Sequence, residues 1–478
     1  MLDKRQFYIN GAWVDPRDGT DLEVIDPATE EAVAVISLGG QADTDAAVAA
    51  ARAAFPGWAA TPLEERIRFA ERYIEAYEAR SEDVAQAISS EMGAPIELAR
   101  GPQRLNGVRH VHDFIRAARA WEPEHPLGEH APGNLITHDA IGVCGMITPW
   151  NWPLNQVVQK VMPAVIMGCT SILKPSEIAP LSSIVFAEIM DEIGLPPGVF
   201  NMVNGDGPGV GTQLSTHKDV DMISFTGSTR AGIAITKAAA DTLKRVTLEL
   251  GGKGANIVFA DASDNAVVSG VRQCFLNTGQ SCLAPTRMLV ERSRYDQAVE
   301  EAAKTAEAYT YGQTGDMMTN IGPVVSAAQF EKVQGLIQRG IDEGARLVAG
   351  GLGRPEGKNR GYYCRGTIFA DVTNDMTIAR EEIFGPVLSM MPFDTEEEAI
   401  AIANDTDYGL TSYVETMDDE KRLRVARQLR SGGVQTNSTP RGPGAPFGGY
   451  KMSGNGREGG IWGLMEYVEV KNISGLNL

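Results

Sequence analysis

Five short apolar runs between residues 142 and 250 decide the fold class of this chain. They are GVCGMIT (142–148), TSILKP (170–175), VFNMVN (199–204), DMISFTG (221–227) and VTLEL (246–250). Segments with apolar residues three and four apart separate the runs, which start about 20 to 30 residues apart, the length of one strand–helix unit. Runs that are apolar on both faces and joined by helices indicate a parallel sheet with helices on both sides. We therefore expect an α/β, Rossmann-like doubly wound domain that binds a nucleotide beyond the carboxyl ends of its strands.

The pattern changes on either side of this stretch. Residues 43–120 have helical spacing, and a loop rich in proline and glycine follows at 121–134. After LELGGK, strands and helices alternate again to about residue 435, which predicts a second α/β domain. The alternation in EYVEV (466–470) predicts a final strand.

Length and composition set limits on the function. The chain has 478 residues, which suggests about three structural units, and its 43% hydrophobic and 22% charged residues are typical of globular proteins. The 62 acidic residues outnumber the 43 basic ones, and a net charge of −19 repels nucleic-acid phosphates and anionic lipid surfaces. No run of about 18 apolar residues and no signal-peptide pattern occurs. We expect a soluble, cytoplasmic protein that binds neither nucleic acid nor membranes.

The five cysteines differ in the roles that their sequence positions indicate. Their number is odd and no pair has the spacing of metal ligands, so we expect free thiols and no metal site. Cys282 stands out because NTGQSC (277–282) places it just after a helical stretch that we expect to reach Thr278. A thiolate is a strong nucleophile, although at a pKa near 8.5 only about 3% of a thiol is ionised at pH 7. The other cysteines fit buried, structural thiols: Cys144, Cys169, Cys274 and Cys364.

Two further side chains could assist such a nucleophile. Glu249 in LELGGK ends a predicted strand, where α/β proteins place catalytic carboxylates. For an isolated glutamate, an ion pair with a lysine such as Lys253 is the better explanation. Asn151 in PWNWPL follows the strand that ends at Thr148, and its amide could donate to a developing oxyanion. Ordinary turn chemistry would also explain an asparagine there.

Three more motifs follow strand ends and could contact a nucleotide. In KPSE, Lys174 suits a phosphate or ribose hydroxyl, and Glu177 would accept hydrogen bonds from an adenosine ribose while repelling a 2′-phosphate. GDGPGVG (205–211) and FTGSTRAG (225–232) precede predicted helices whose N-termini can bind phosphate. GDGPGVG lacks the GxGxxG spacing, because Val210 stands where the third glycine is required.

Taken together, these motifs resemble the aldehyde dehydrogenase superfamily. The similarity extends from FYINGAWV (7–14) to the EYVEVK tail, with eight motifs in the family's order and spacing. They are PWNWPL, KPSE, GDGPGVG, FTGSTRAG, LELGGK, NTGQSC, EEIFGP (381–386) and PFGGYKMSGNGRE (446–458). The resemblance implies NAD(P)-dependent oxidation of an aldehyde to a carboxylic acid.

The resemblance also implies catalytic roles. Cys282 would attack the aldehyde carbonyl, and the side-chain amide of Asn151 with the backbone N–H of Cys282 would hold the oxyanion of the resulting thiohemiacetal. After hydride transfer to the nicotinamide, Glu249 would activate the water that hydrolyses the thioester. The coenzyme-A-acylating branch typically lacks this glutamate, so Glu249 favours hydrolytic release.

A cofactor site is implied in the same way. Lys174 and Glu177 would contact the adenosine ribose, Ser228 the pyrophosphate and Glu382 the nicotinamide ribose, with Phe384 beside the nicotinamide ring. Glu177 favours NAD over NADP on charge grounds, and NADP remains possible. The other residues expected to bind the cofactor are Ile147, Thr148, Pro149, Trp150, Gly207, Gly211, Phe225, Gly227 and Leu250.

The substrate tunnel of relatives is lined by the helix that follows the oxyanion asparagine. Here Trp152, Asn155, Gln156 and Gln159 recur at helical spacing, and three amides suggest a tunnel that hydrogen-bonds a polar aldehyde. Alternatively, some of these amides point sideways and satisfy backbone groups. The further expected tunnel residues are Leu276, Leu283, Phe447 and Trp462.

The resemblance implies three functional parts. They are an NAD-binding domain at 1–120 and 140–249, a catalytic domain at 250–445, and a small β oligomerisation arm at 121–139 and 465–478. The arm would extend onto a neighbouring subunit and give a homotetramer or a dimer.

Other functions compete with a hydrolytic aldehyde dehydrogenase. A coenzyme-A-acylating or semialdehyde-specific relative is one alternative, and Glu249 argues against it. A cofactor-independent cysteine esterase would need only Cys282, Asn151 and Glu249, and would leave Glu382 and the phosphate-binding turns without a purpose. A binding protein that retains the fold predicts a missing nucleophile or base, and neither is missing.

Overall fold

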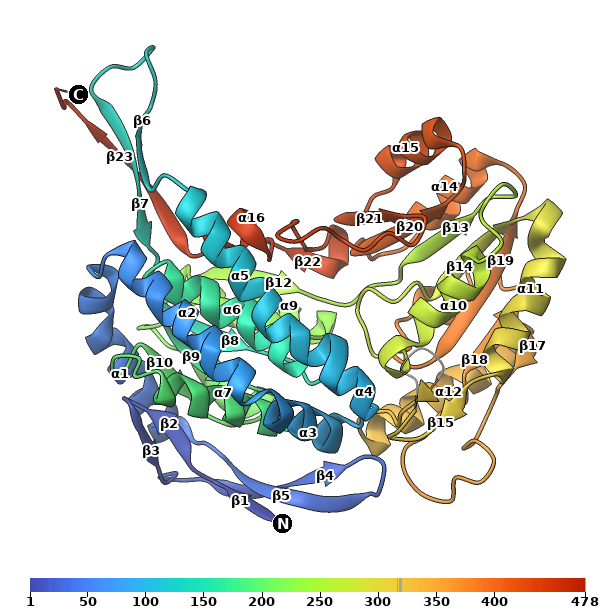
Figure 1. Cartoon of the computed structure of the whole chain (residues 1–478), viewed down its shortest axis with the longest axis horizontal. Coiled ribbons are helices and arrows are strands. Elements are labelled where there is room, and N and C mark those ends of the chain that lie inside the picture. Colours follow the sequence, from blue (N-terminus) through green and yellow to red (C-terminus); the bar gives the residue numbers. More distant parts are fainter. Residues whose placement is uncertain (316, 318–319, 478) are drawn as a thin grey trace.

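A computed structural model of the chain describes residues 1–315, 317 and 320–477. In this part of the chain, two large sheets dominate, one of eight strands and one of seven, with helices packed around both (Figure 1). The predicted α/β class is confirmed, and the two sheets form the two lobes of the molecule.

The eight-stranded sheet contains the five predicted parallel strands at its centre. Its order is β22-β12-β11-β8-β9-β10-β2-β3. The parallel strands are β8 (Val143–Ile147), β9 (Thr170–Lys174), β10 (Phe200–Met202), β11 (Met222–Thr226) and β12 (Arg245–Glu249). The chain runs from β8 to β9 on one side and later reaches β11 on the other, so the strand order reverses between β8 and β11. Doubly wound sheets open a ligand crevice at such a switch point.

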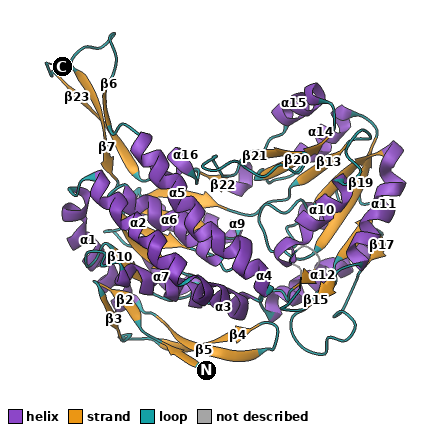
Figure 2. Ribbon diagram, in the orientation of Figure 1, coloured by secondary structure: helices purple, strands orange, loops and turns teal. Residues whose placement is uncertain are grey.

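Both faces of this sheet are covered, which explains why its strands are apolar throughout (Figure 2). On β8, Cys144 and Met146 join one core with helices α2, α3, α5, α6 and α7, whereas Val143 and Ile147 join another with α1, α8 and α9. The helices are α1 (Gln41–Ala59), α2 (Leu63–Ala79), α3 (Ser81–Met92), α4 (Ile96–Leu98), α5 (Arg104–Ala120), α6 (Pro153–Ile166), α7 (Leu181–Glu192), α8 (Thr212–Thr216) and α9 (Thr229–Ala239). The antiparallel edge strands are β2 (Phe7–Ile9), β3 (Ala12–Val14) and β22 (Gly454–Asn455).

The seven-stranded sheet confirms the second α/β unit. Its order is β17-β18-β19-β14-β13-β20-β21, and β17 alone is antiparallel to its neighbour. The strands are β13 (Ala255–Val258), β14 (Arg287–Glu291), β17 (Arg346–Ala349), β18 (Thr367–Ala370), β19 (Val387–Phe393), β20 (Thr411–Glu415) and β21 (Gly433–Thr436). The helices are α10 (Ala266–Phe275), α11 (Arg292–Glu307), α12 (Ala327–Asp342), α13 (Thr377–Arg380), α14 (Glu396–Asn404) and α15 (Asp419–Gln428).

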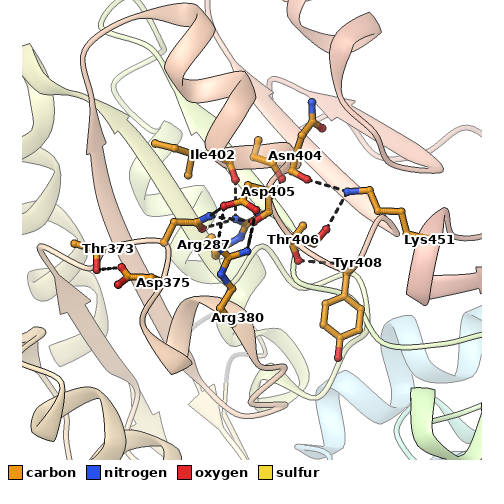
Figure 3. A network of polar contacts seen from close by, with 12 residues as sticks. Arg287, Thr373, Asp375, Arg380, Ile402, Asn404, Asp405, Thr406, Tyr408 and Lys451 are labelled. Carbon is orange, nitrogen blue, oxygen red and sulfur yellow. Dashed lines mark hydrogen bonds and ion pairs between the residues drawn. The ribbon is translucent and has the colours of Figure 1, made fainter.

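A polar network around Arg287, at the start of β14, links several segments of this second lobe (Figure 3). The buried guanidinium of Arg287 donates to the backbone carbonyls of Lys253, Ile402 and Ala403 at 2.9 to 3.1 Å. Lys451, from the segment that returns to the first sheet, donates to the carbonyl of Asn404 at 2.8 Å. The network therefore fixes the LELGGK segment and ties the two lobes together.

Three small sheets complete the fold. One contains β1 (Leu2–Lys4), β5 (Glu31–Leu38) and β4 (Thr20–Asp26), and another pairs β15 (Thr310–Tyr311) with β16 (Asn320–Ile321). The third contains β6 (Glu124–Pro126), β7 (Asn134–Ala140) and β23 (Val468–Ser474), and it projects from the body of the molecule (Figure 1). The predicted final strand is confirmed as β23, which follows α16 (Gly460–Met465) and pairs antiparallel with β7.

One expected element differs. The helix before NTGQSC was expected to reach Thr278, but α10 ends at Phe275. Asn277 and Thr278 both have left-handed φ values, of 55° and 59°, which a regular α-helix does not contain. No helix in the described ranges is both long and apolar enough to span a membrane.

Candidate active site

The carboxyl ends of four neighbouring strands meet at the switch point. Asn151 follows β8, Lys174 ends β9, Ser228 follows β11 and Glu249 ends β12. Parallel strands present their carboxyl ends at one edge, so motifs separated by up to about 100 residues in sequence come together there.

The loop that carries Cys282 is tightly wound. Asn277, Thr278 and Gly279 adopt three successive left-handed conformations. Buried Gln280 fixes the turn, because its Nε2 donates to the carbonyl of Asn277 at 3.3 Å and its Oε1 accepts from Val325 N at 2.9 Å. The thiol of Cys282 emerges partly exposed, whereas the four other cysteines are buried, as expected.

Asn151 is hydrogen-bonded to this loop. Its side-chain Nδ2 donates to the carbonyl of Gln280 at 3.0 Å, and its own carbonyl accepts from Asn277 Nδ2 at 2.8 Å. Gln103 Nε2 donates to the same carbonyl at 3.1 Å. The amide of Asn151 therefore lies beside the cysteine loop with a second N–H that can serve an oxyanion.

Glu249 approaches the same loop from β12. Its side chain is buried, and neither carboxylate oxygen has a hydrogen-bond partner in the described part of the chain. The Nζ of Lys253 likewise has none, so the ion pair considered for these two residues does not form. A Cβ at Gly252 would lie 2.4 Å from the carbonyl oxygen of Cys282, which shows how closely LELGGK packs on the nucleophile segment.

A small cavity lies behind Glu249, lined also by Gln159, Lys160 and Glu458. Lys160 Nζ and Glu458 Oε1 form a buried ion pair at 2.5 Å. Burial raises the pKa of Glu249 well above its ordinary value, and the neighbouring carboxylate of Glu458 raises it further. Burial and the carboxylate of Glu458 thus both favour the protonated form of Glu249.

The resting nucleophile is a thiol. Burial raises the pKa of Cys282, and the carboxylates of Glu382 and Glu249 raise it further. Since the thiolate is the reactive form, a nearby base or positive charge has to assist its ionisation.

The residues expected at the adenosine end lie close together. Lys174 Nζ contacts Glu177 Oε2 at 3.2 Å, and the Lys174 side chain also passes Gly211 in the π-helical turn that begins at Gly207. Ser228 caps the N-terminus of α9, where its Oγ accepts from Ala231 N at 3.3 Å. The segment thus presents a helix N-terminus of the kind that binds phosphate.

The residues expected at the nicotinamide end also gather. Glu382 Oε1 accepts from Gly252 N at 2.9 Å, which places its carboxylate beside LELGGK. The rings of Trp150 and Phe384 meet edge to face, with centroids 5.4 Å apart. Phe384 has a left-handed φ of 60°, an unusual conformation for a bulky residue.

The switch point fits a nucleotide. The hydroxyls of Thr148 and Thr226 are buried there without partners among the described residues. A Cβ at Gly227 would lie 2.3 Å from the ring of Phe225, so the β11 turn has no room for a larger residue. The neighbouring residues predicted to bind the cofactor lie at the ends of β8 and β12 or on β11: Ile147, Pro149, Phe225 and Leu250.

Among the predicted tunnel residues, Trp152 contacts the nucleophile loop, and Leu276 and Leu283 lie at its two ends in sequence. Trp152 precedes α6, and its Nε1 donates to Ser281 Oγ at 2.8 Å. Asn155 Oδ1 contacts His110 Nε2 at 2.8 Å. The Oε1 atoms of Gln156 and Gln159 are buried without partners within the described ranges, so these oxygens do not accept from backbone groups there. The apolar members are half-buried or exposed: Leu276, Leu283, Phe447 and Trp462.

Several contributors to the site escaped sequence reasoning. Lys160 and Glu458 form the ion pair beside Glu249, and Gln103 and His110 reach the site from the helical segment around α5. Glu458 ends the quoted motif PFGGYKMSGNGRE, which was the available signal. For the other three, only the packing of α5 and α6 shows the connection.

Comparison with known proteins identifies the family. Residues 13–473 match the family model described as the aldehyde dehydrogenase family. A Pseudomonas protein named 3-succinoylsemialdehyde-pyridine dehydrogenase is 51% identical, with 99% of each chain covered. An aldehyde dehydrogenase structure from Bartonella henselae matches with a TM-score of 0.98 and 56% identity, covering 99% of this chain and 100% of that one. A third match is a structure of aldehyde dehydrogenase C from Pseudomonas syringae, a cysteine-to-alanine mutant complexed with NAD+ and octanal. Its TM-score is 0.96 and its identity 49%, and the match covers 98% of this chain and 96% of that one.

The chain therefore belongs to the aldehyde dehydrogenase family. The predicted family, fold class and enzyme class are confirmed, and the protein is an oxidoreductase that acts on aldehydes. Among the described residues, no cluster of three or more histidine, cysteine, aspartate or glutamate side chains could hold a metal ion.

Proposed function

We propose that this aldehyde dehydrogenase oxidises its aldehyde with NAD and releases the carboxylic acid by hydrolysis. The supporting observation is that three segments far apart in sequence meet at one place. The loop of Cys282 accepts a hydrogen bond from Asn151 and packs against the LELGGK turn that follows Glu249. A thiol, an amide donor and an unpaired buried carboxylate form the set that acyl transfer through a thioester needs.

Acylation depends on Cys282 and Asn151. The thiolate of Cys282 attacks the carbonyl carbon, and the S–C bond forms as the carbonyl oxygen gains negative charge. Asn151 Nδ2–H and the backbone N–H of Cys282 donate to this oxygen, a contribution of about 3 kcal/mol per donor in comparable sites. Lys174, Glu177, Ser228 and Glu382 would hold NAD, which would supply the acceptor for a hydride from the same carbon. Loss of that hydride leaves a thioester on Cys282.

Hydrolysis depends on Glu249. Its unpaired carboxylate takes a proton from a water that attacks the thioester, so that the C–S bond breaks and the carboxylic acid leaves. The Lys160–Glu458 pair lines the same cavity and offers a route by which this proton moves on from Glu249.

The cofactor preference rests on Glu177. Its carboxylate lies against Lys174 at the end of β9 and suits the hydroxyls of an adenosine ribose, whereas a 2′-phosphate would meet a negative charge. NAD is therefore the expected cofactor and NADP the weaker one. The NAD bound by the Pseudomonas syringae relative supports this assignment.

The arm supports self-association. The β6–β7–β23 sheet projects from the body, and six of the seven residues of β23 are exposed in a single chain. An exposed strand with apolar residues such as Val470 invites pairing with a second copy, and we propose a homotetramer or a dimer. Five free thiols fit a reducing cytoplasm.

The chain segments divide into three parts under this proposal. They are the NAD-binding part (1–120 and 140–249), the catalytic part (250–445) and the arm (121–139 and 465–478). The strands of the two large sheets and of the arm fall largely within these ranges.

The test is NADH formation by the purified protein with short aliphatic, long aliphatic, aromatic and hydroxylated aldehydes. Each aldehyde is combined with NAD or NADP, with and without coenzyme A, beside a Cys282→Ala control. We expect turnover with NAD that needs no coenzyme A and disappears in the control. Strict dependence on coenzyme A would favour the acylating alternative, and ester hydrolysis without NADH formation would favour the esterase.

A further inference from the structure

An arginine beside the active site has no partner for its charge. Arg441 lies in the loop that leaves β21 in the second sheet and enters β22 in the first, where the chain crosses between the lobes (Figure 1). It is exposed, and its guanidinium carbon lies 4.6 Å from the ring centre of the predicted tunnel residue Phe447. Within the described ranges, the guanidinium makes no ion pair and no hydrogen bond.

Two of the acids near Arg441 have other partners, and Glu249, the third, has no hydrogen-bond partner in the described part of the chain. Glu458 is paired with Lys160 at 2.5 Å. Asp113 accepts from Arg116 Nη2 at 2.6 Å and from a backbone N–H at 2.8 Å. The N–H donors of Arg441 are consequently left available to an incoming group.

The charge of Arg441 reaches the reaction site. The side chain is exposed at its surface, but the protein atoms on its inner side shield the guanidinium from water and lower the pKa of Arg441. The nearby carboxylates of Glu458 and Glu249 oppose this effect. The same guanidinium, after the larger effect of burial, lowers the pKa of His110, the partner of Asn155. Burial and Arg441 thus both favour the neutral form of His110.

The loop of Arg441 is held in place near both of its ends. Ser438 N donates to Glu415 Oε1 at 3.0 Å, and Phe447 exchanges two backbone hydrogen bonds with Glu458 at 2.7 and 2.8 Å. A fixed loop reduces the conformational entropy lost when the guanidinium binds a ligand.

We propose that Arg441 binds a carboxylate of the substrate, so that the preferred substrates are aldehydes with an anionic group at the end remote from the carbonyl. This inference rests on the proposed function, because it assigns the class of aldehyde that Cys282 receives. It takes up the semialdehyde alternative again with hydrolytic release retained, since Glu249 bears on how the product leaves and not on the remote end of the substrate. Asn151 and Glu249 are buried, whereas Arg441 is exposed, so its guanidinium can meet a substrate that arrives from solvent. A guanidinium matches both oxygens of a carboxylate, whereas a neutral aldehyde gains nothing from it.

The test compares matched aldehydes: 4-oxobutanoate with its methyl ester, and 5-oxopentanoate with its methyl ester. The readout is the ratio of kcat/KM for acid over ester in the wild type, Arg441→Gln and Arg441→Lys. We expect the wild type to favour the acids, and Arg441→Gln to lower the ratio about 10- to 100-fold, mainly through KM. Arg441→Lys should keep more of the preference for acids than Arg441→Gln does. The lysine keeps the positive charge but lacks the paired N–H donors that match both carboxylate oxygens. The control is Arg72→Gln, since Arg72 is also exposed and stacks on an aromatic ring, with its guanidinium carbon 4.1 Å from Phe69.

Three results of the comparison of acids with esters, or of the mass measurement, would overturn the inference, and two further results would do so as well. The first is a ratio of kcat/KM for acid over ester near one in the wild type. The second is an equal loss of kcat/KM for acids and esters in Arg441→Gln. The third is a change of oligomeric mass in Arg441→Gln that accounts for its lower activity. An equal shift of both pH profiles would assign Arg441 to ionisation of Cys282 or Glu249 instead. If wild-type protein turns over esters but not acids, the proposed function stands and this inference falls. If it oxidises no aldehyde, the proposed function itself fails.

Discussion

At the scale of single residues, the site depends on groups whose ionisation is shifted by burial. Cys282 and Glu249 have raised pKa values for the same first reason, desolvation, and each carboxylate nearby adds to the effect. A neutral thiol and a neutral acid do not react, so ionisation of both groups limits the chemistry at low pH.

Glu249→Gln should therefore separate the two half-reactions. The variant keeps the size of the side chain and removes the base, so the thioester forms and then hydrolyses slowly. We expect a burst of about one NADH per active site followed by a steady rate lowered about 100-fold or more. Rapid mixing with fluorescence detection measures both phases.

The pH dependence provides the control for this prediction. Because the pKa of Glu249 is raised, the steady rate of the wild type should rise with pH as this carboxyl loses its proton. In Glu249→Gln, the remaining steady rate should no longer show the increase with pH that ionisation of Glu249 causes in the wild type. An unchanged steady rate in Glu249→Gln would contradict a role in hydrolysis.

At the scale of elements, the left-handed turn before Cys282 sets the geometry. Thr278 is β-branched and has a φ of 59°, a conformation that costs about 1 to 3 kcal/mol and persists only when its surroundings impose it. Its Oγ donates to the carbonyl of Gly322 at 3.1 Å, and Asn277 Nδ2 donates to the carbonyls of Asn151 and Gln280.

Asn277→Ala should weaken catalysis without touching the substrate. It removes the hydrogen bond that joins the nucleophile loop to the carbonyl of Asn151 and the one that closes the loop on the carbonyl of Gln280, so both reacting groups gain freedom. We expect kcat to fall up to about 100-fold, because small displacements of reacting groups have effects of that size. Steady-state kinetics measures the fall, and NAD binding followed by fluorescence serves as the control. A lowered NAD affinity with unchanged kcat would contradict the prediction.

A second element holds a buried acid. Glu91 on α3 is fully buried and accepts from the N–H groups of Leu181 and Ser182 at the start of α7. Burial raises the pKa of Glu91 from 4.5 to about 7. The folded state therefore holds this proton more tightly than the unfolded state, and stability falls as pH rises from about 4.5 to about 7.

Glu91→Gln removes this titration. The free energy of unfolding of the variant, relative to the wild type, should increase by up to about 3 kcal/mol between about pH 5 and pH 8. Thermal unfolding at the two pH values measures the trend, with the exposed Glu65→Gln as the control. A constant difference between Glu91→Gln and wild type would show that Glu91 does not titrate in this range.

At the scale of the whole molecule, the arm joins distant parts of the chain. β23 pairs with β7 from Val468–Ala140 to Ser474–Asn134, so residues more than 300 positions apart form one projecting sheet. Val470 on this sheet is 64% exposed in the single chain, which is unusual for an aliphatic residue unless a partner covers it.

Val470→Glu should reduce self-association. A buried, unpaired carboxylate in an interface is strongly unfavourable, so the variant should shift toward smaller species. Light scattering after size-exclusion chromatography measures the mass. Met417→Glu, at a position 65% exposed on another part of the surface, is the matched control. An unchanged mass for Val470→Glu would place the interface elsewhere.

Much of the fold was predictable because parallel strands buried on both faces are apolar throughout. The runs at β8, β9, β10, β11 and β12 were predicted at nearly their observed bounds. The family was predictable because eight motifs occur in a fixed order. The exact end of α10 was not, since the left-handed turn at Asn277 and Thr278 is imposed by contacts with Asn151 and Gly322, which lie far away in sequence.

The sequence alone determined the α/β class, the family and the identity of the nucleophile, because strand periodicity and motif order are properties of the chain itself. The tertiary structure decided which polar groups remain unpaired. It showed that Glu249 and Lys253 do not pair, that Lys160 joins Glu458, and that Arg441 makes no ion pair with any residue that the structure describes. Whether a charge is paired depends on neighbours from other segments, and packing alone brings those neighbours together.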